Sequence, residues 1–270
     1  PLHELALKHK AEVWFDMGLA PGMSNLVAGL FAQKIPNCEE ISLYVGGLPV
    51  ERVFPYEYRA VFSPTDVIEE YTRPARIVRE GVVRSLPALS EPEFLEVPKI
   101  GTLEAFLTDG LRSLIDNLSI PNMREMTLRY PGHREFMLRL REGGFFSDDT
   151  LQNSGMTARQ ATEQVLLKGW HMADTDADCT VFVGIGKNLD SEHRISMIDY
   201  RDPVTSYTSM ARTTGFVAAA IASFLITNGK IRGSGVFAPE KLVDHPEALT
   251  YLNRYLLERN VAYMGLEGLI

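Results

Sequence analysis

The sequence predicts an α+β (α/β) fold in which helices cover a mixed β-sheet. A strand–turn–helix pattern over residues 11–34 is typical of a doubly wound sheet. Residues 178–187 and 193–202 have the pattern of a β-hairpin, and the apolar run over about 209–227 predicts a buried core helix. Hydrophobic residues make up 45% of the 270 residues, which is enough for a sizeable core.

Turn and cap signals set the elements of the first half of the chain. A tight Pro-Gly turn at 21–22 separates the first strand from its helix, and Ser63 with Pro64 begins a second helix. Residues 51–100 otherwise alternate short strands and turns. The sequence therefore predicts the end of a helix in the first residues, strands at 11–18 and 40–50, and helices up to residue 34 and at 63–71.

Proline and glycine residues also indicate where helices begin and end in the second half of the chain. Pro131 begins a helix that Gly143 and Gly144 end, and Gly229 ends the long apolar helix. The predicted elements are a strand at 123–130, helices at 131–141, 157–169, 209–227 and 247–260, a Pro-Glu turn into a short helix within 236–243, and the hairpin.

Charge and cysteine content narrow the class of protein. The net charge of −8 and the lack of a lysine or arginine cluster argue against a nucleic-acid partner. Cys38 and Cys179 lack C-x-x-C spacing, which argues against a disulfide scaffold and a zinc site. The first ten residues lack the apolar stretch of a signal peptide, and the weakly polar run at 214–226 is shorter than the roughly 20 residues of a membrane span. We therefore expect a soluble, cytoplasmic protein with no membrane partner.

Motifs for nucleotides and metals are missing or incomplete. No Gly-x-Gly-x-x-Gly follows a strand, and Gly184-x-Gly186 in the expected hairpin is interpreted as a turn. The D-T-D-A-D run at 174–178 has the spacing of a calcium loop, but Cys179 stands where the loop needs glycine. We expect no metal, and a solvated loop at this run.

Three arginines in glycine-containing phrases are the strongest candidates for a ligand site. They are Arg112 in T-D-G-L-R-S-L, Arg129 in L-R-Y-P-G-H and Arg212 in T-S-M-A-R-T-T-G. A guanidinium is a planar fork of donors that matches a carboxylate. The set predicts a cleft that binds a substrate with several carboxylates. For each arginine taken alone, a surface or structural ion pair is the alternative.

His133 is the candidate for proton transfer. It follows Pro131-Gly132 at an expected helix N-terminus, four residues after Arg129. A helix N-terminus disfavours the imidazolium and favours bound anions. His133 is therefore predicted to be a neutral donor to a substrate carboxylate or a general base, with a capping or packing histidine as the alternative.

Other polar residues extend the candidate site. Arg212 with Thr213 and Thr214 opens the 209–227 helix, where they either form an anion site or cap the helix. Asp109 belongs to the site of Arg112 or caps a short helix that carries this arginine. Tyr44, before a Gly-Gly pair, is a further candidate for substrate binding.

Six phrases spread along the chain, in order, resemble the C-terminal part of the saccharopine dehydrogenase-like family, which includes saccharopine dehydrogenases and lysine 6-dehydrogenases. They are D-M-G-L-A-P-G-M-S-N-L (16–26), L-Y-V-G-G-L-P (43–49), F-L-T-D-G-L-R-S-L (106–114), T-L-R-Y-P-G-H (127–133), T-S-M-A-R-T-T-G-F (208–216) and G-V-F-A-P-E (235–240).

The resemblance implies a two-part enzyme with an N-terminal Rossmann domain. It divides the chain into the end of a truncated Rossmann domain (1–34), a substrate-binding and dimerisation domain (35–235) and a return to the Rossmann domain (236–270). Because the fingerprint is missing, NAD or NADP is expected to bind mainly to a missing N-terminal half, and this chain alone is expected to be inactive.

The resemblance also implies where the site residues lie and which reaction the enzyme catalyses. It places Gly18, Pro21 and Gly22 near the nicotinamide, and the three arginines and His133 in or around the substrate cleft. The implied reaction is NAD(P)-dependent hydride transfer at the CH–NH bond of saccharopine or lysine, in a homodimer. The alternative is a non-catalytic dimerisation or binding module of the same fold.

Overall fold

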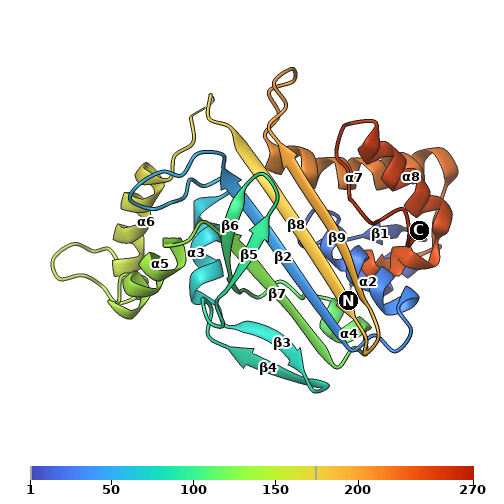
Figure 1. Cartoon of the computed structure of the whole chain (residues 1–270), viewed down its shortest axis with the longest axis horizontal. Helices are drawn as coiled ribbons and strands as arrows, with labels where there is room; N and C mark the ends of the chain where they lie inside the picture. The colour runs from blue at the N-terminus through green and yellow to red at the C-terminus, as the bar shows by residue number, and fades with distance from the viewer. Residues whose placement is uncertain (1, 174) are drawn as a thin grey trace.

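The computed structural model describes residues 2–173 and 175–270, so Asp174 of the predicted solvated loop lies outside the described residues. Within these residues, eight strands form one sheet (Figure 1), in the order β4-β3-β7-β2-β8-β9 with β6 beside β7 and β5 beside β6. The pair β2–β7 is parallel and its neighbour pair β2–β8 is antiparallel, which confirms the predicted mixed sheet. The strands are β2 (Glu40–Pro49), β3 (Ala75–Arg79), β4 (Val82–Leu86), β5 (Glu93–Val97), β6 (Gly101–Leu107), β7 (Asn122–Arg129), β8 (Asp178–Lys187) and β9 (Glu192–Tyr200).

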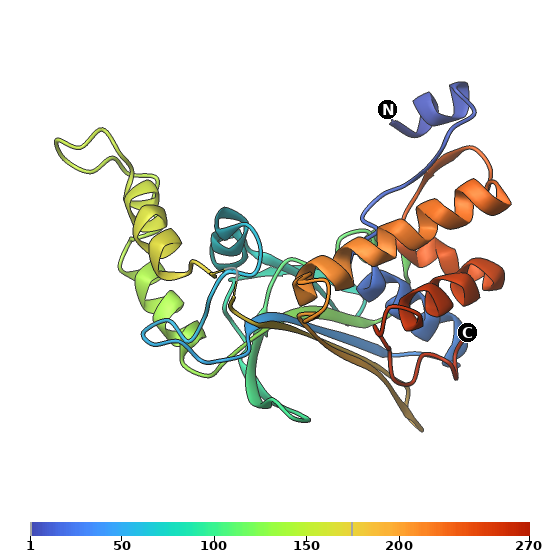
Figure 2. The ribbon, with the colours of Figure 1, turned by 90° about the horizontal axis from the view of Figure 1, so that it is seen from above.

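Helices cover one face of this sheet, as Figure 2 shows from above. The main core lies between the sheet and three of them, where Phe31, Ile221 and Leu252 pack with Phe182 and Met197 of the hairpin. The helices are α1 (Leu2–Lys8), α2 (Met23–Lys34), α3 (Pro64–Thr72), α4 (Leu114–Asn117), α5 (His133–Glu142), α6 (Ala158–Gly169), α7 (Ser209–Asn228), the 3-10 helix η1 (Pro239–Asp244) and α8 (Pro246–Leu257).

Gly184 and Gly186 have a packing role that the sequence interpretation missed. They lie inside strand β8 and do not form a turn. A Cβ at Gly184 would approach Val27 to 2.8 Å, and one at Gly186 would approach Phe31 to 2.6 Å. Helix α2 therefore sits closely on the sheet because these two positions carry no side chain.

Helices α3, α5 and α6 build a separate core at one end of the sheet, where α5 and α6 extend away from it in Figure 2. Trp170 and Tyr58 are fully buried there, with their rings 5.4 Å apart in an edge-to-face arrangement. The predicted helix at 131–141 begins two residues late, at His133, because Gly132 adopts φ of 100°. Gly143 ends it as expected.

Two other predicted elements differ from the structure. The strand predicted at 11–18 is shorter: β1 (Glu12–Trp14) pairs in parallel with β10 (Gly235–Phe237). No helix carries Arg112, which has φ of 51° and precedes α4. The alternative of Asp109 as a helix cap is wrong, because its carboxylate accepts hydrogen bonds from Arg76 instead.

Helix α7 is, within the described residues, the one helix with the length and composition of a membrane span. Core helices of globular proteins also have these properties. Here Val217, Ile221 and Phe224 are buried in the main core, and α8 packs beside α7. One face of α7 therefore packs in the core as predicted, whereas Ala218, Ala222 and Ile226 are exposed.

Candidate functional site

A cavity of about 610 Å³ lies on the helix-covered face of the sheet. Its floor is formed by β2 and β7, and its walls by the turn at 18–21, by α3 and by the first turns of α7. Strand β7 contributes Glu125, Thr127 and Arg129. Since alternate residues of a strand point to the same face, these three polar side chains line the cavity while Met126 and Leu128 pack in the core behind the sheet.

Arg129 provides a cation to this cavity. Its Nη2 donates to Glu70 Oε2 at 2.8 Å, and its Nη1 donates to the backbone oxygen of Leu128 at 3.0 Å. The guanidinium carbon lies 4.6 Å from the centre of the Tyr58 ring, a cation–π contact. Among the described residues, Nε has no hydrogen-bond partner, although Arg129 is only 1% exposed. An unpaired buried donor of this kind is unusual, and it marks Arg129 as a candidate ligand-binding residue of the cavity.

Glu125 is the second unusual charged group of the cavity. Burial, together with the charge of Glu70, raises the pKa of Glu125 to about 8. Within the part of the chain that the structure describes, the side chain receives one hydrogen bond, from Thr108 Oγ1 to Oε2 at 3.3 Å. Burial also raises the pKa of Glu70, although Arg129 opposes that shift. The Glu125 carboxyl is therefore largely protonated near neutral pH, and it is able to donate or accept a proton.

Gly110 makes room for this carboxyl group. A Cβ at position 110 would overlap the Glu125 carboxylate. Position 110 of the T-D-G-L-R-S-L phrase therefore needs glycine for packing against Glu125. The sequence interpretation had predicted a functional role for Arg112 of the same phrase. Sequence reasoning also missed Glu125 itself. The available signal was the alternation of polar Glu125, Thr127 and Arg129 in a strand otherwise expected to be buried.

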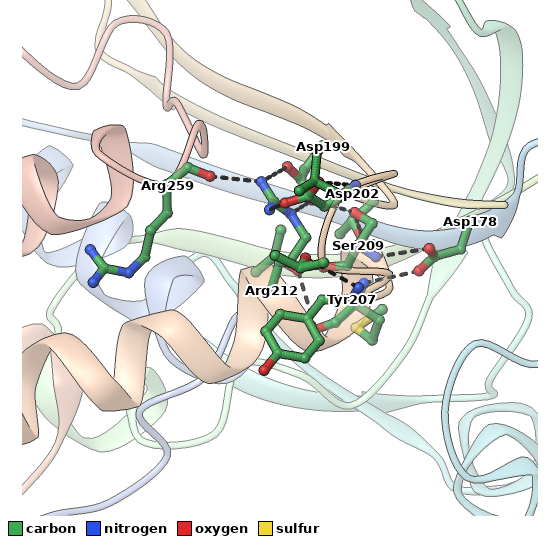
Figure 3. Close-up of polar contacts among 12 residues, drawn as sticks. Asp178, Asp199, Asp202, Tyr207, Ser209, Arg212 and Arg259 are labelled. Carbon is green, nitrogen blue, oxygen red and sulfur yellow. Dashed lines mark hydrogen bonds and ion pairs between the residues drawn. The ribbon is translucent and has the colours of Figure 1, made fainter. Parts of the chain in front are cut away.

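Arg212 lies in a buried ionic network (Figure 3). Its Nε and Nη2 each donate to Asp199 at 3.1 Å, and its Nη1 donates to Asp202 at 3.2 Å. Nη2 also donates to the backbone oxygen of Arg259 at 2.8 Å. The residue is 5% exposed. These contacts occupy the guanidinium fork, so the structure places Arg212 in the alternative role of a structural ion pair.

The N-terminus of α7 is likewise occupied by a protein carboxylate. Asp178 accepts hydrogen bonds from the backbone nitrogens of Ser209 and Met210 at 2.8 and 3.0 Å. Asp178 is fully buried, so the prediction of a solvated loop is wrong for this residue. Thr208 caps the helix, while the Thr213 hydroxyl donates to the Ser209 backbone oxygen. The anion site predicted at this helix start is therefore filled from within the chain.

Arg112 is held at the surface. Its Nε and Nη2 donate to the Asp16 carboxylate at 3.1 and 3.3 Å, and its side chain is 45% exposed. It is not among the residues that line the cavity.

Replacing Arg112 with alanine is expected to lower the free energy of unfolding by less than about 1 kcal/mol, as for other exposed ion pairs. Urea unfolding of the Arg112→Ala variant measures this. A loss of several kcal/mol would show that the Asp16 pair supports the turn before α2 more strongly than its exposure suggests.

Tyr44 and His133 also lie outside the cavity. Tyr44 points to the other face of the sheet, where its hydroxyl donates to Glu93 and accepts from Arg124. His133 is fully buried between the rings of Tyr58, Tyr71 and Trp170.

The contacts of His133 define its tautomer. Its Nδ1 lies 2.7 Å from the backbone oxygen of Tyr56, which only accepts, so Nδ1 carries the proton and Nε2 accepts from the Tyr71 hydroxyl at 2.8 Å. Burial lowers the pKa of His133 to about 3. Both ring nitrogens are therefore hydrogen-bonded within the protein. This agrees with the alternative interpretation, in which His133 is a packing histidine.

The turn predicted to lie near a nicotinamide does line the cavity. Gly18 and Pro21 form one wall, and the Gly18 nitrogen donates to the Pro21 oxygen at 3.1 Å. Gly22 has φ of 142°, and a Cβ there would overlap the Gly18 carbonyl. The first backbone nitrogens of α2 are already bonded, Met23 N to Gly18 O and Ser24 N to Leu19 O. This turn offers a wall for a flat ring, but among the described residues its helix start does not fit a pyrophosphate.

The fold is an α+β domain built on a mixed sheet, with this cavity on the helix-covered face. Residues 18–258 match the family model of the saccharopine dehydrogenase C-terminal domain, and the chain belongs to that family. Its structure is similar to that of apo saccharopine dehydrogenase (L-Glu forming) from Saccharomyces cerevisiae, with a TM-score of 0.78 and 18% sequence identity. The match covers 97% of this chain and 75% of the yeast chain, and at this identity it shows the shared fold.

Proposed function

We propose that the chain is the substrate-binding part of an NAD(P)-dependent amino-acid dehydrogenase that acts on the CH–NH bond of saccharopine or lysine. The supporting observation is the cavity itself, which combines one arginine with an unpaired donor, two carboxyl groups and the Gly18–Pro21 wall. Membership of the saccharopine dehydrogenase family supports oxidoreductase chemistry of this type.

The residues of the chain have defined tasks in this proposal. Arg129 lines the cavity and has one unpaired donor, Nε, so it is assigned the binding of a substrate carboxylate, to which a guanidinium makes a strong charge-assisted hydrogen bond. Glu125 is the cavity group whose proton is exchangeable near neutral pH. NAD(P), when bound, supplies the hydride chemistry. The described residues do not fit the phosphates of the nucleotide, because the first backbone nitrogens of α2 and α7 are already bonded within the chain.

Replacing Arg129 with methionine is expected to raise the KM for the amino acid by about 10- to 150-fold, the value of a hydrogen bond to a charged group. Methionine retains most of the buried volume but has no donor. The measurement is steady-state reduction of NAD⁺ or NADP⁺ with saccharopine or L-lysine, on the protein of the complete reading frame. The KM for the nucleotide should stay unchanged.

The Arg112→Ala variant is the matched control, because it also removes an arginine but lies outside the cavity. It should leave both KM values unchanged. The proposal is wrong if the unmodified protein reduces neither nucleotide with saccharopine or with lysine.

A further inference from the structure

We infer that Glu125, with Glu70 beside it, binds the ammonium group of the amino-acid substrate. This inference rests on the proposed function and concerns the part of the cavity that Arg129 does not explain. Glu125 is 6% exposed and lines the cavity, and Thr108 gives its carboxyl group one hydrogen bond, at 3.3 Å. A buried carboxyl group with this little hydrogen bonding has capacity for a ligand donor.

The surroundings favour an organic cation over a metal ion. Within the described residues, no group of three or more histidine, cysteine, aspartate or glutamate side chains gathers as a metal site would require. Glu70 already accepts from Arg129 at 2.8 Å, which leaves Glu125 as the group with free capacity. An ammonium needs few oxygen acceptors, and Thr127 on the same face adds a hydroxyl to the cavity wall.

The two groups suit a ligand with charges of both signs. Glu125 and Arg129 lie on the same face of β7, and both line the cavity. An amino acid whose amine and carboxylate are separated by a carbon chain can contact both groups.

Charge balance links ammonium binding to proton release. The charged groups that face Glu125 are Glu70 from α3, Asp109 from the loop after β6 and Arg129 from β7; two of these are negative, and they favour the protonated carboxyl group. When the ammonium enters, Glu125 loses its proton to solvent and the carboxylate pairs with the ligand cation. The positive charge of the ammonium replaces the released proton, so the charge beside Glu125 stays constant.

The experiment follows Glu125 directly by carbon NMR of the chain with labelled glutamate side chains. The Glu125→Gln variant identifies the signal, which should titrate near pH 8 without ligand. At pH 7, L-lysine should move this signal to its ionised position, and hexanoate, which has no amine, should not. Calorimetry in buffers of different ionisation enthalpy should show release of nearly one proton for each bound lysine.

Two variants complete the test. Glu125→Gln should release no proton on lysine binding and should bind lysine at least about tenfold more weakly. Glu93→Gln, a carboxylate on the other face of the sheet, should behave like the unmodified chain. The inference is overturned if saturating or very high lysine leaves the Glu125 signal unchanged, or if Glu125→Gln binds lysine equally well. If the protein reduces the nucleotide but lysine does not change the ionisation of Glu125, this inference alone is wrong. If lysine causes Glu125 to ionise but the nucleotide is not reduced, the proposed reaction alone is contradicted.

Discussion

Replacing Arg212 with alanine is expected to lower the free energy of unfolding by about 3–5 kcal/mol, the effect of removing one partner from a buried ion pair. The change would leave Asp199 buried without its cation, since Arg212 provides both hydrogen bonds of that ion pair. It would also remove a link between α7 and the backbone of Arg259, near the end of α8. Urea unfolding followed by circular dichroism measures the loss.

A double-mutant cycle with Asp199→Asn distinguishes this structural role from a substrate role. If the pair is structural, the two single changes should not be additive, and the coupling should amount to at least about 1 kcal/mol. Arg112→Ala serves as the exposed comparison. If the Arg212→Ala protein is instead stable but has a strongly raised KM for the amino acid, Arg212 has a substrate-binding role.

The contrast among the three arginines shows what the sequence could and could not predict. Helix bounds were predicted well, because their causes are local: Gly143 and Gly229 end α5 and α7, and Thr157 with Gln160 begins α6. Ion-pair partners are not local. Arg112 pairs with a residue 96 positions away, and Arg129 pairs with Glu70, 59 positions away. The local phrases around these arginines are alike, so only the fold could separate a cavity residue from a structural one.

The same reasoning explains why the carboxyl groups of the cavity were missed. Glu125 lies in a strand that the sequence predicts correctly, and its neighbours at two-residue spacing indicate a polar face. Its raised pKa, however, comes from burial and from Glu70 on a distant helix. The fold brings together Gly18, Pro21, Arg129 and Thr214 from the predicted residues, and it adds Glu70 and Glu125 to them.

Glu125→Gln is expected to stabilise the free protein, in contrast to the Arg212 change. The pKa of Glu125 is about 8 in the fold against a reference value of 4.5. Between these values the folded state holds a proton that the unfolded state has lost, so the contribution of Glu125 to stability falls as pH rises from 4.5 through 8. Glutamine mimics the protonated carboxyl group and has no such dependence. At pH 7 the gain is therefore on the order of 3 kcal/mol, from 1.36 kcal/mol for each pKa unit.

Unfolding measured at pH 4 and at pH 8 tests this expectation. The variant and the unmodified chain should have nearly equal stability at pH 4, and the variant should be clearly more stable at pH 8. Equal stability at both values would mean that Glu125 ionises normally, and it would remove the physical basis for an exchangeable proton in the cavity. A residue that lowers the stability of the free protein is consistent with a ligand role, because a bound cation would relieve the cost of its ionised form.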